Sequence, residues 1–198
     1  MVNLYSRKYN IEYYHIPKNG MTSIINTLNF KWEEQKNIPK DRKVLCILRD
    51  PIDRFVSSYF FLKKHPRIQN IKNLPQESIK KMFLQNEEEG FKNYLSEIKN
   101  NGYFDNHNLP QIKYINDENG LIPGNVKSIR STSEVTNFIL FKNMTSELKS
   151  ITDEKIVLKH MNSSKIDKNF KNKLKSQFGE EIINLYKKDY NLYKKNDI

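Results

Sequence analysis

Apolar residues along this chain form two short unbroken runs, each followed by a helix-like repeat. The runs IEYYHI (11–16) and KVLCIL (43–48) are rich in β-branched, aromatic and aliphatic residues and predict two buried strands. Continuous apolar runs are typical of parallel strands covered on both faces. Helical patterns over residues 22–31 and 51–64 follow the two runs. The opening of the chain therefore predicts a right-handed βαβ arrangement.

The remaining pattern predicts more of the same α/β domain. Residues 65–104 combine a polar connector with a helical pattern and are interpreted as a helical insertion or lid. Irregular, strand-like and short helical stretches follow, and residues 155–164 resemble a strand that leads into a polar turn. Residues 168–195 are helical in pattern. No repeat or low-complexity linker divides the chain, so residues 1–198 predict one domain with a mainly parallel central sheet flanked by helices.

Charge and cysteine content narrow the functional classes. The net charge of +11 favours an anionic partner, although a solvated lysine-rich surface explains it equally well. Cys46 is the single cysteine, lies in the second apolar run and is expected to be a buried structural thiol. The sequence shows neither a membrane span nor an apolar signal segment, so we expect a cytoplasmic protein. It also shows no metal-ligand cluster.

The turn PKNGMTS (17–23) is the first candidate site. Helix N-termini expose unpaired N–H groups and a partial positive charge, which bind phosphate or sulfate. Lys18 adds a full charge, Gly20 allows close backbone approach, and Thr22 and Ser23 add hydroxyl donors. The lysine precedes the glycine, unlike the GxxxxGK[ST] order of nucleotide kinases. An ordinary strand–helix turn capped by Thr22 is the alternative.

The segment RDPIDRFVSSY (49–59) is the second candidate site. Arg49 follows a predicted parallel strand, at the edge where open α/β sheets bind ligands. Asp50 is a good N-cap for the next helix, and Ser57 lies about two turns into it. Arg49 and Ser57 are therefore predicted to converge on a second phosphate. Arg54 is expected to form a structural ion pair.

Together, HIPKNGMTS and ILRDPIDRFVSSY resemble the two cofactor-binding motifs of the sulfotransferases that use 3′-phosphoadenosine 5′-phosphosulfate (PAPS), most closely carbohydrate sulfotransferases of the family 2 type. The resemblance implies a P-loop-kinase-like three-layer α/β fold. It implies that the first loop holds the 5′-phosphosulfate and that the second motif holds the 3′-phosphate. The residues so assigned are Pro17, Lys18, Asn19, Gly20, Met21, Thr22 and Ser23 in the first loop, and Arg49 and Ser57 in the second motif. Because glycine is common where Met21 stands, the Met21 side chain should point away from any ligand.

Later segments extend this resemblance over nearly the whole chain. DNHNLPQ (105–111) resembles the family's Asp/Asn-x-His…Pro-Gln element, and TNFILFKNMTSEL and INLYKKDYNLY resemble its later strand–helix segment and closing helix. HMNSS (160–164) resembles a turn beside the nucleotide, which implies that His160 and Ser163 contact the cofactor. The insertion at 65–104 would then lie on the acceptor side.

The resemblance implies in-line transfer of a sulfuryl group from PAPS to a hydroxyl, expected to belong to a saccharide. Catalysis then depends on positioning and on charge stabilisation, without a metal. Lys18 would neutralise charge on the leaving oxygen, and His107 is the first candidate for the general base. A histidine packed in an irregular loop is the alternative for His107. His15 is expected to be structural, His65 solvated, and the glutamates 87–89 the solvated start of a helix.

Three other functions compete with this interpretation. A nucleotide kinase would need a lysine after the glycine and acidic residues for Mg²⁺. A nucleic-acid-binding module would need a reading element with interleaved basic and aromatic residues. The tail LYKKDYNLYKK has such residues, but its helical spacing suits a packed tyrosine stripe, so we expect no nucleic-acid partner. A catalytically degenerate member of the same fold is the third. The oligomeric state cannot be inferred.

Overall fold

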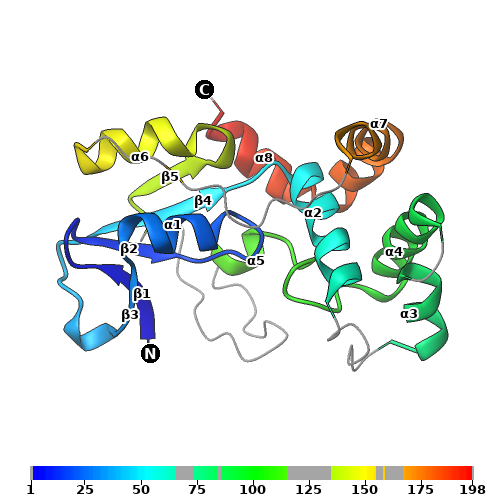
Figure 1. Ribbon diagram of the computed structural model, residues 1–198, viewed down its shortest axis with the longest axis horizontal. Helices are drawn as coiled ribbons and strands as arrows, with labels where there is room; N and C mark the ends of the chain where they lie inside the picture. Colours follow the sequence, from blue (N-terminus) through cyan, green and yellow to red (C-terminus); the bar gives the residue numbers. More distant parts are fainter. Residues whose placement is uncertain are drawn as a thin grey trace.

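Five strands of the computed structural model form one mixed sheet in the order β3–β1–β2–β4–β5 (Figure 1). The structure describes residues 2–65, 74–83, 86–115, 135–154, 158 and 167–197. The predicted strand and turn over 155–164, with His160 and Ser163, lie outside these ranges apart from Leu158, which is buried. The strands are β1 (Val2–Ser6), β2 (Ile11–Tyr14), β3 (Lys31–Glu34), β4 (Lys43–Leu48) and β5 (Asn137–Leu140).

Strand direction agrees with the predicted sheet, except at β1. β2 pairs with β4 and β4 with β5 in parallel, whereas β1 is antiparallel to both β2 and β3. β1 therefore runs against the other four described strands. The mixed α/β class and the flanking helices are confirmed, and the two predicted apolar runs are the adjacent central strands β2 and β4.

The sequence pattern did not predict β1 and β3, because neither has a clear apolar signal. β1 contains two buried polar residues: Asn3 donates to Glu12 Oε1 at 2.7 Å, and Ser6 Oγ donates to the Leu28 carbonyl at 2.7 Å. β3 has the sequence KWEE and is mostly exposed. Charged residues are a common feature of edge strands, where they discourage pairing with another chain.

Eight α-helices are described. They are α1 (Met21–Leu28), α2 (Pro51–Lys64), α3 (Gln76–Phe83), α4 (Glu87–Asn101), α5 (Ile112–Ile115), α6 (Met144–Thr152), α7 (Lys168–Leu185) and α8 (Lys187–Lys195). α2 begins as predicted, since the Asp50 side chain accepts a hydrogen bond from Asp53 N at 2.9 Å and Pro51 occupies the first turn. α1 ends at Leu28, three residues earlier than predicted, and the left-handed Asn29 (φ 51°) is its C-cap. The predicted C-terminal helix is divided at Tyr186.

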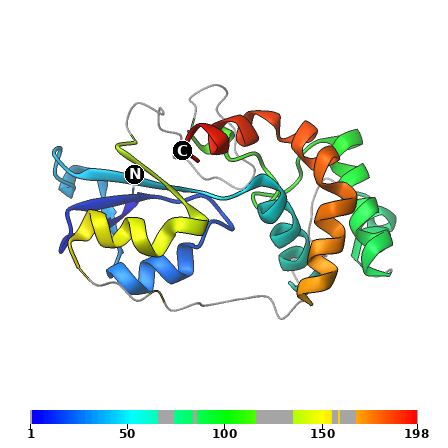
Figure 2. The ribbon, with the colours of Figure 1, turned by 90° about the horizontal axis from the view of Figure 1, so that it is seen from above.

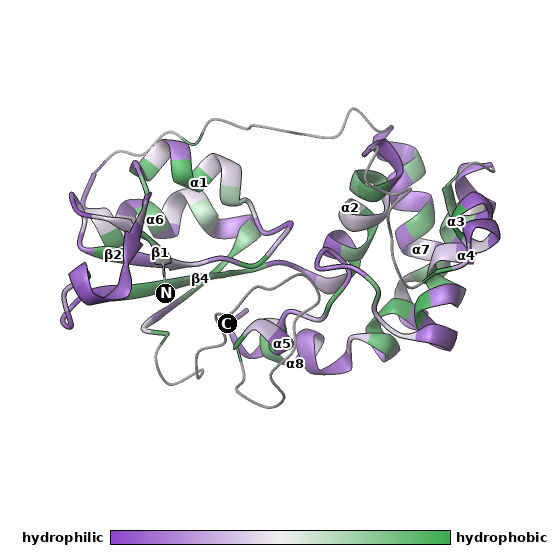
Figure 3. Cartoon of the chain, turned by 90° about the horizontal axis from the view of Figure 1, so that it is seen from below, coloured by the Kyte–Doolittle hydropathy of each residue, from purple (hydrophilic) through white to green (hydrophobic). Residues whose placement is uncertain are grey.

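Helices cover both faces of the sheet (Figure 2). α1 and α6 pack on one face through an apolar cluster that includes Ile24 and Leu148. α5 and α8 pack on the other face, where Tyr114 and Tyr193 contact residues of β4. β4 is hydrophobic along most of its length (Figure 3). Cys46 of β4 is fully buried, and burial raises the pKa of its thiol, in agreement with the expected structural role.

α2, α3, α4 and α7 form a separate helical group beside the sheet, with an aromatic core. Tyr59 and Phe91 meet edge to face, with ring centroids 5.1 Å apart. Gly90 allows α3 and α4 to approach closely, because a Cβ there would lie 2.5 Å from Met82 O and 2.6 Å from Tyr59 Oη. α3 and α4 agree with the helical pattern predicted within residues 65–104, and the lid role stays a prediction.

None of the helices in the described ranges is both long and apolar enough to cross a membrane.

Candidate functional site

The first predicted site is a loop that joins the carboxyl end of β2 to the N-terminus of α1. Lys18 (φ 70°) and Gly20 (φ 85°) both adopt left-handed conformations in this loop. Gly20 is the N-cap, no side chain caps the helix, and the first turn contains no acidic residue. The first helical hydrogen bond runs from Ile24 N to Gly20 O at 3.2 Å. The N–H groups of the first turn therefore have no intrahelical acceptor and favour an anion.

Glycine at position 20 is required for packing as well as for conformation. A Cβ on Gly20 would lie 2.9 Å from Cε2 of Phe141, and the left-handed φ disfavours any side chain. The sequence analysis attributed this glycine to a close approach by a ligand, and the structure adds a protein contact. The neighbouring Met21 side chain packs against the apolar cluster that includes Ile24 and Leu148. This agrees with the expectation that Met21 points away from a ligand.

Arg49 connects the second motif to the first loop. Its Nη1 donates to the Lys18 carbonyl at 2.9 Å, and its guanidinium carbon lies 4.7 Å from the centre of the Phe141 ring. Its Nε is buried and has no acceptor among the described residues. Ser57 is half-buried in α2 and makes no side-chain hydrogen bond within the described part of the chain. Arg49 thus retains a donor, and its convergence with Ser57 on a phosphate stays a prediction.

Gln111 holds the two candidate loops together. Its Oε1 accepts from Arg49 N at 3.0 Å and from Asn19 Nδ2 at 2.6 Å, and its Nε2 donates to Arg49 O at 2.8 Å. Asn19 Nδ2 also donates to Ile47 O at 2.6 Å. The amide hydrogens of Asn19 are thereby used inside the protein, so Asn19 shapes the loop instead of offering them to a cofactor. The sequence motif included Gln111 but gave it no role.

Arg54 is a buried cation that also ties these loops together. Its Nε donates to Pro17 O at 3.1 Å and its Nη1 to Leu109 O at 2.8 Å, while Nη2 has no acceptor among the described residues. The predicted ion pair is wrong, since no carboxylate of the described residues pairs with this guanidinium. Asp53, the acidic residue of α2, pairs instead with Lys175.

Phe61 brings the two candidate catalytic residues to one place. Lys18 Nζ lies 4.1 Å from the centre of the Phe61 ring, and the His107 ring lies 4.3 Å from it at an angle of 33°. His65, which was expected to be solvated, is exposed, but its ring also contacts Phe61, with centroids 4.2 Å apart and the ring planes at 36°. Phe61 was not predicted as a site residue, because its apolar helical spacing predicts only core packing.

His107 is held at the start of an irregular turn by a carboxylate. Asp105 Oδ1 accepts from the His107 backbone N–H at 2.7 Å and also contacts ring Nδ1. Burial acts to raise the pKa of Asp105, but its hydrogen bonds to His107 outweigh burial and lower it. Ser58 Oγ of α2 donates to the His107 carbonyl, so backbone and ring are both fixed.

Positive charges lie close to this loop and help to lower the pKa values of Lys18 and His15. Burial, and then the charges of Arg49 and Arg54, lower the pKa of Lys18 to about 8. Burial, with the neighbouring His107 and Arg54, lowers the pKa of His15 to about 4. His15 is therefore neutral at physiological pH, in line with its expected structural role. The loop is a concentrated cationic site, suited to an anion that would restore full protonation of Lys18.

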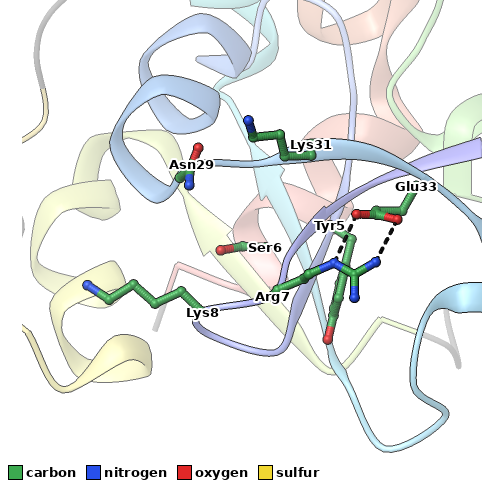
Figure 4. Close-up of a pocket in the computed structure, with 7 residues that line it drawn as sticks. All are labelled: Tyr5, Ser6, Arg7, Lys8, Asn29, Lys31 and Glu33. Carbon is green, nitrogen blue, oxygen red and sulfur yellow. Dashed lines mark hydrogen bonds and ion pairs between the residues drawn. The ribbon is translucent and has the colours of Figure 1, made fainter.

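Other charged groups lie away from this site. Glu87–Glu89 form the first turn of α4, capped by Asn86, as a solvated helix start requires. A cavity of about 270 Å³ lies at the opposite end of α1, between Asn29 and the turn after β1 (Figure 4). Arg7 and Glu33 pair within it at 3.0 Å, so it is distinct from the loop site. No metal-binding group of three His, Cys, Asp or Glu residues occurs among the described residues.

One comparison with known proteins gives a match. A family model described as the sulfotransferase family matches residues 3–196, which is nearly the whole chain. Neither the curated proteins nor the solved structures give a match.

Proposed function

The chain belongs to the sulfotransferase family, and on this premise we propose that it transfers a sulfuryl group from PAPS to a hydroxyl group of a saccharide acceptor. One observation carries the proposal: the uncapped N-terminus of α1 lies beside Lys18 and Arg49, and Arg49 retains a buried donor without a partner. A helix N-terminus without a side-chain cap, next to two cations, fits a phosphosulfate better than a neutral ligand. A P-loop-kinase-like fold is part of the same proposal.

The residues present fit the proposed donor. The loop at 17–23 would hold the 5′-phosphosulfate through the N–H groups of the first turn of α1, with Lys18 as a full positive charge. Arg49 and Ser57 would hold the 3′-phosphate. His160 and Ser163 are proposed to contact the nucleotide from the segment outside the described residues. When bound, the donor supplies an activated sulfuryl group, and the chain's own residues provide orientation and charge.

Lys18 is proposed to balance the negative charge that develops on the leaving oxygen. Its ammonium lies over Phe61 and its main-chain carbonyl is held by Arg49, so the loop carrying it is fixed before any ligand binds. A preorganised charge of this kind stabilises a transition state without reorganisation during the reaction. Because the pKa of Lys18 is near 8, an anionic neighbour would raise this pKa and keep the ammonium charged.

His107 is proposed to be the general base for the acceptor hydroxyl. It shares the Phe61 ring with Lys18, so a hydroxyl that reaches the donor beside Lys18 also comes close to the imidazole. Histidine is suited to proton transfer near neutral pH. The described helices of the segment 65–104 pack on α2, the helix that carries Phe61, and we propose that this segment borders the acceptor site.

Calorimetric titration with adenosine 3′,5′-bisphosphate tests the nucleotide site. We expect micromolar-range binding by the wild type and at least about tenfold weaker binding by Arg49→Ala, because a charge-assisted hydrogen bond contributes roughly 1.5–3 kcal/mol. Arg7→Ala is the matched control, since Arg7 pairs with Glu33 at the other end of α1. Lys18→Ala should bind the product nearly normally and yet fail in transfer from labelled PAPS.

Three outcomes would count against the proposal. A folded wild type that does not bind the bisphosphate would reject the donor. Equal retention of wild type and Arg49→Ala on single-stranded DNA across a salt series, without bisphosphate binding, would favour nucleic-acid binding instead. Bisphosphate binding without transfer to any saccharide would favour the catalytically degenerate alternative.

A further inference from the structure

Asp105 contacts His107 in two ways that have different chemical consequences. Its Oδ1 accepts from the His107 backbone N–H at 2.7 Å, and the same oxygen contacts ring Nδ1. Both side chains are partly exposed, at 27% each, so the ring is accessible from solvent. A carboxylate at Nδ1 fixes the proton on that nitrogen, because the hydrogen bond made by one ring nitrogen decides the tautomer. Nε2 is then left with a free lone pair.

We propose that Asp105 is a positioning residue for catalysis: it holds His107 in the Nδ1–H tautomer and stabilises the imidazolium formed when Nε2 takes the acceptor proton. This inference rests on the proposed function and adds a second residue to the proposed base. As the acceptor oxygen bonds to sulfur and the bond from sulfur to the leaving phosphate oxygen breaks, the hydroxyl proton moves to Nε2. It passes to solvent after the product leaves.

The charges around His107 explain why a carboxylate is needed there. Lys18 reaches the same Phe61 ring from the first loop, and His65 contacts it from the end of α2. Arg54 and His15 lie close enough that the charges of Arg54 and His107 lower the pKa of His15. A positive imidazole among these groups would be repelled. Among the described residues, Asp105 is the carboxylate that contacts the ring and offsets this repulsion.

A purely structural role for Asp105 makes a different prediction. The main chain of Asp105 forms a turn, with its carbonyl accepting from Asn108 N and Leu109 N at 3.1 Å each. An asparagine at 105 would keep the turn and could keep the oxygen acceptor, while it removes the negative charge. A structural role therefore predicts little change in Asp105→Asn, whereas the proposed role predicts a loss of transfer rate.

The matched control is Asp167→Asn. Asp167 Oδ1 accepts from the backbone N–H two residues later, at 3.0 Å, as Asp105 does, but it caps α7 and makes no contact with an imidazole of the described residues. In single-turnover transfer from labelled PAPS, we expect Asp105→Asn to be slower by about 10²-fold or more, within the range of general-base contributions. Its affinity for adenosine 3′,5′-bisphosphate should stay within about twofold of wild type, and Asp167→Asn should match wild type in both.

Histidine ¹⁵N NMR provides a readout that does not depend on activity. The chain has four histidines, so a His107→Asn sample assigns the His107 resonances. Neutral His107 should show a protonated Nδ1 and an unprotonated Nε2, and Asp105→Ala should shift the ring toward a tautomer mixture. A protonated Nε2 in the neutral wild type, or transfer by Asp105→Asn at the wild-type rate, would overturn the proposal. If wild type transfers nothing, the NMR result alone decides whether Asp105 sets the tautomer.

Discussion

Arg49 and Gln111 are joined by two reciprocal hydrogen bonds, from Arg49 N to Gln111 Oε1 at 3.0 Å and from Gln111 Nε2 to Arg49 O at 2.8 Å. The Gln111 side chain thus replaces a strand partner at the point where β4 ends. Because its Oε1 also accepts from Asn19, one buried amide sets the spacing of both candidate loops.

Gln111→Ala should therefore affect stability and ligand binding together. Loss of a buried side chain that makes three hydrogen bonds leaves donors and acceptors unpaired, and each costs about 1–3 kcal/mol. We expect the free energy of unfolding in urea to fall by about 2–4 kcal/mol and bisphosphate binding to weaken. Gln76→Ala, at an exposed position in α3, is the control. Unchanged affinity in a destabilised Gln111→Ala would show that the loops keep their spacing without the amide.

The pKa of Lys18 predicts how the transfer rate changes with pH. Because burial and neighbouring cations lower this pKa to about 8, the ammonium is charged below pH 8 and loses its charge above it. The kcat/KM for transfer from labelled PAPS should fall as the pH rises through 8, by at most about tenfold per pH unit for one linked proton, whereas affinity for adenosine 3′,5′-bisphosphate should change little. Initial rates at pH 7 and pH 9.5 measure this change. Lys18→Arg, which keeps its charge, should remove the dependence; an equal dependence in this variant would exclude Lys18 as its source.

The lowered pKa of Lys18 should also make the free energy of unfolding depend on pH. Unfolded Lys18 titrates near its ordinary value of 10.5, so the unfolded chain binds more protons than the folded chain between pH 8 and 10.5. The contribution of Lys18 to stability therefore becomes more favourable as the pH rises through this window. The difference in unfolding free energy between wild type and Lys18→Met should grow in favour of the wild type over this range. A constant difference would contradict the lowered pKa.

Gly20 combines backbone strain with a steric contact. It has a left-handed conformation (φ 85°, ψ 14°), and a Cβ there would lie 2.9 Å from Cε2 of Phe141. Gly20→Ala should cost about 1–3 kcal/mol from conformation alone, with a further steric cost in urea unfolding. Phe141→Leu should recover the steric part. An equal cost of Gly20→Ala in the wild-type and Phe141→Leu backgrounds would show that the Phe141 ring moves aside freely.

The raised pKa of Asp189 should make stability change with pH in the direction opposite to that expected for Lys18. This buried carboxylate accepts from Gln111 N at 2.6 Å and Ile112 N at 2.9 Å, and burial raises its pKa above the ordinary value. The folded chain then binds more protons just above pH 3.8, so stability from this group falls as the pH rises through that window. The stability advantage of wild type over Asp189→Asn should widen on acidification. A parallel pH profile would show that Asp189 titrates normally.

Those parts of the site that depend on residues adjacent in the chain could be predicted from the sequence. The strand–loop–helix around Gly20 and the helix start at Asp50 follow from residue types that are neighbours in the chain. Gln111 and Phe61 were missed because their roles come from contacts between segments about 45 to 90 residues apart. Arg54 was expected to form an ion pair, yet the fold turns it inward toward backbone carbonyls.

Arg54 also has a thermodynamic consequence for any anion that binds here. A guanidinium that is buried with only two carbonyl acceptors destabilises the free protein, since desolvation is only partly offset. The buried Asp189 carboxylate offsets this charge in part, since the charge of Arg54 acts to lower the Asp189 pKa. Arg54 still repels Lys18 together with Arg49. An anion that enters the loop relieves this repulsion, so binding and folding are coupled, and the ligand-bound protein should melt at a higher temperature.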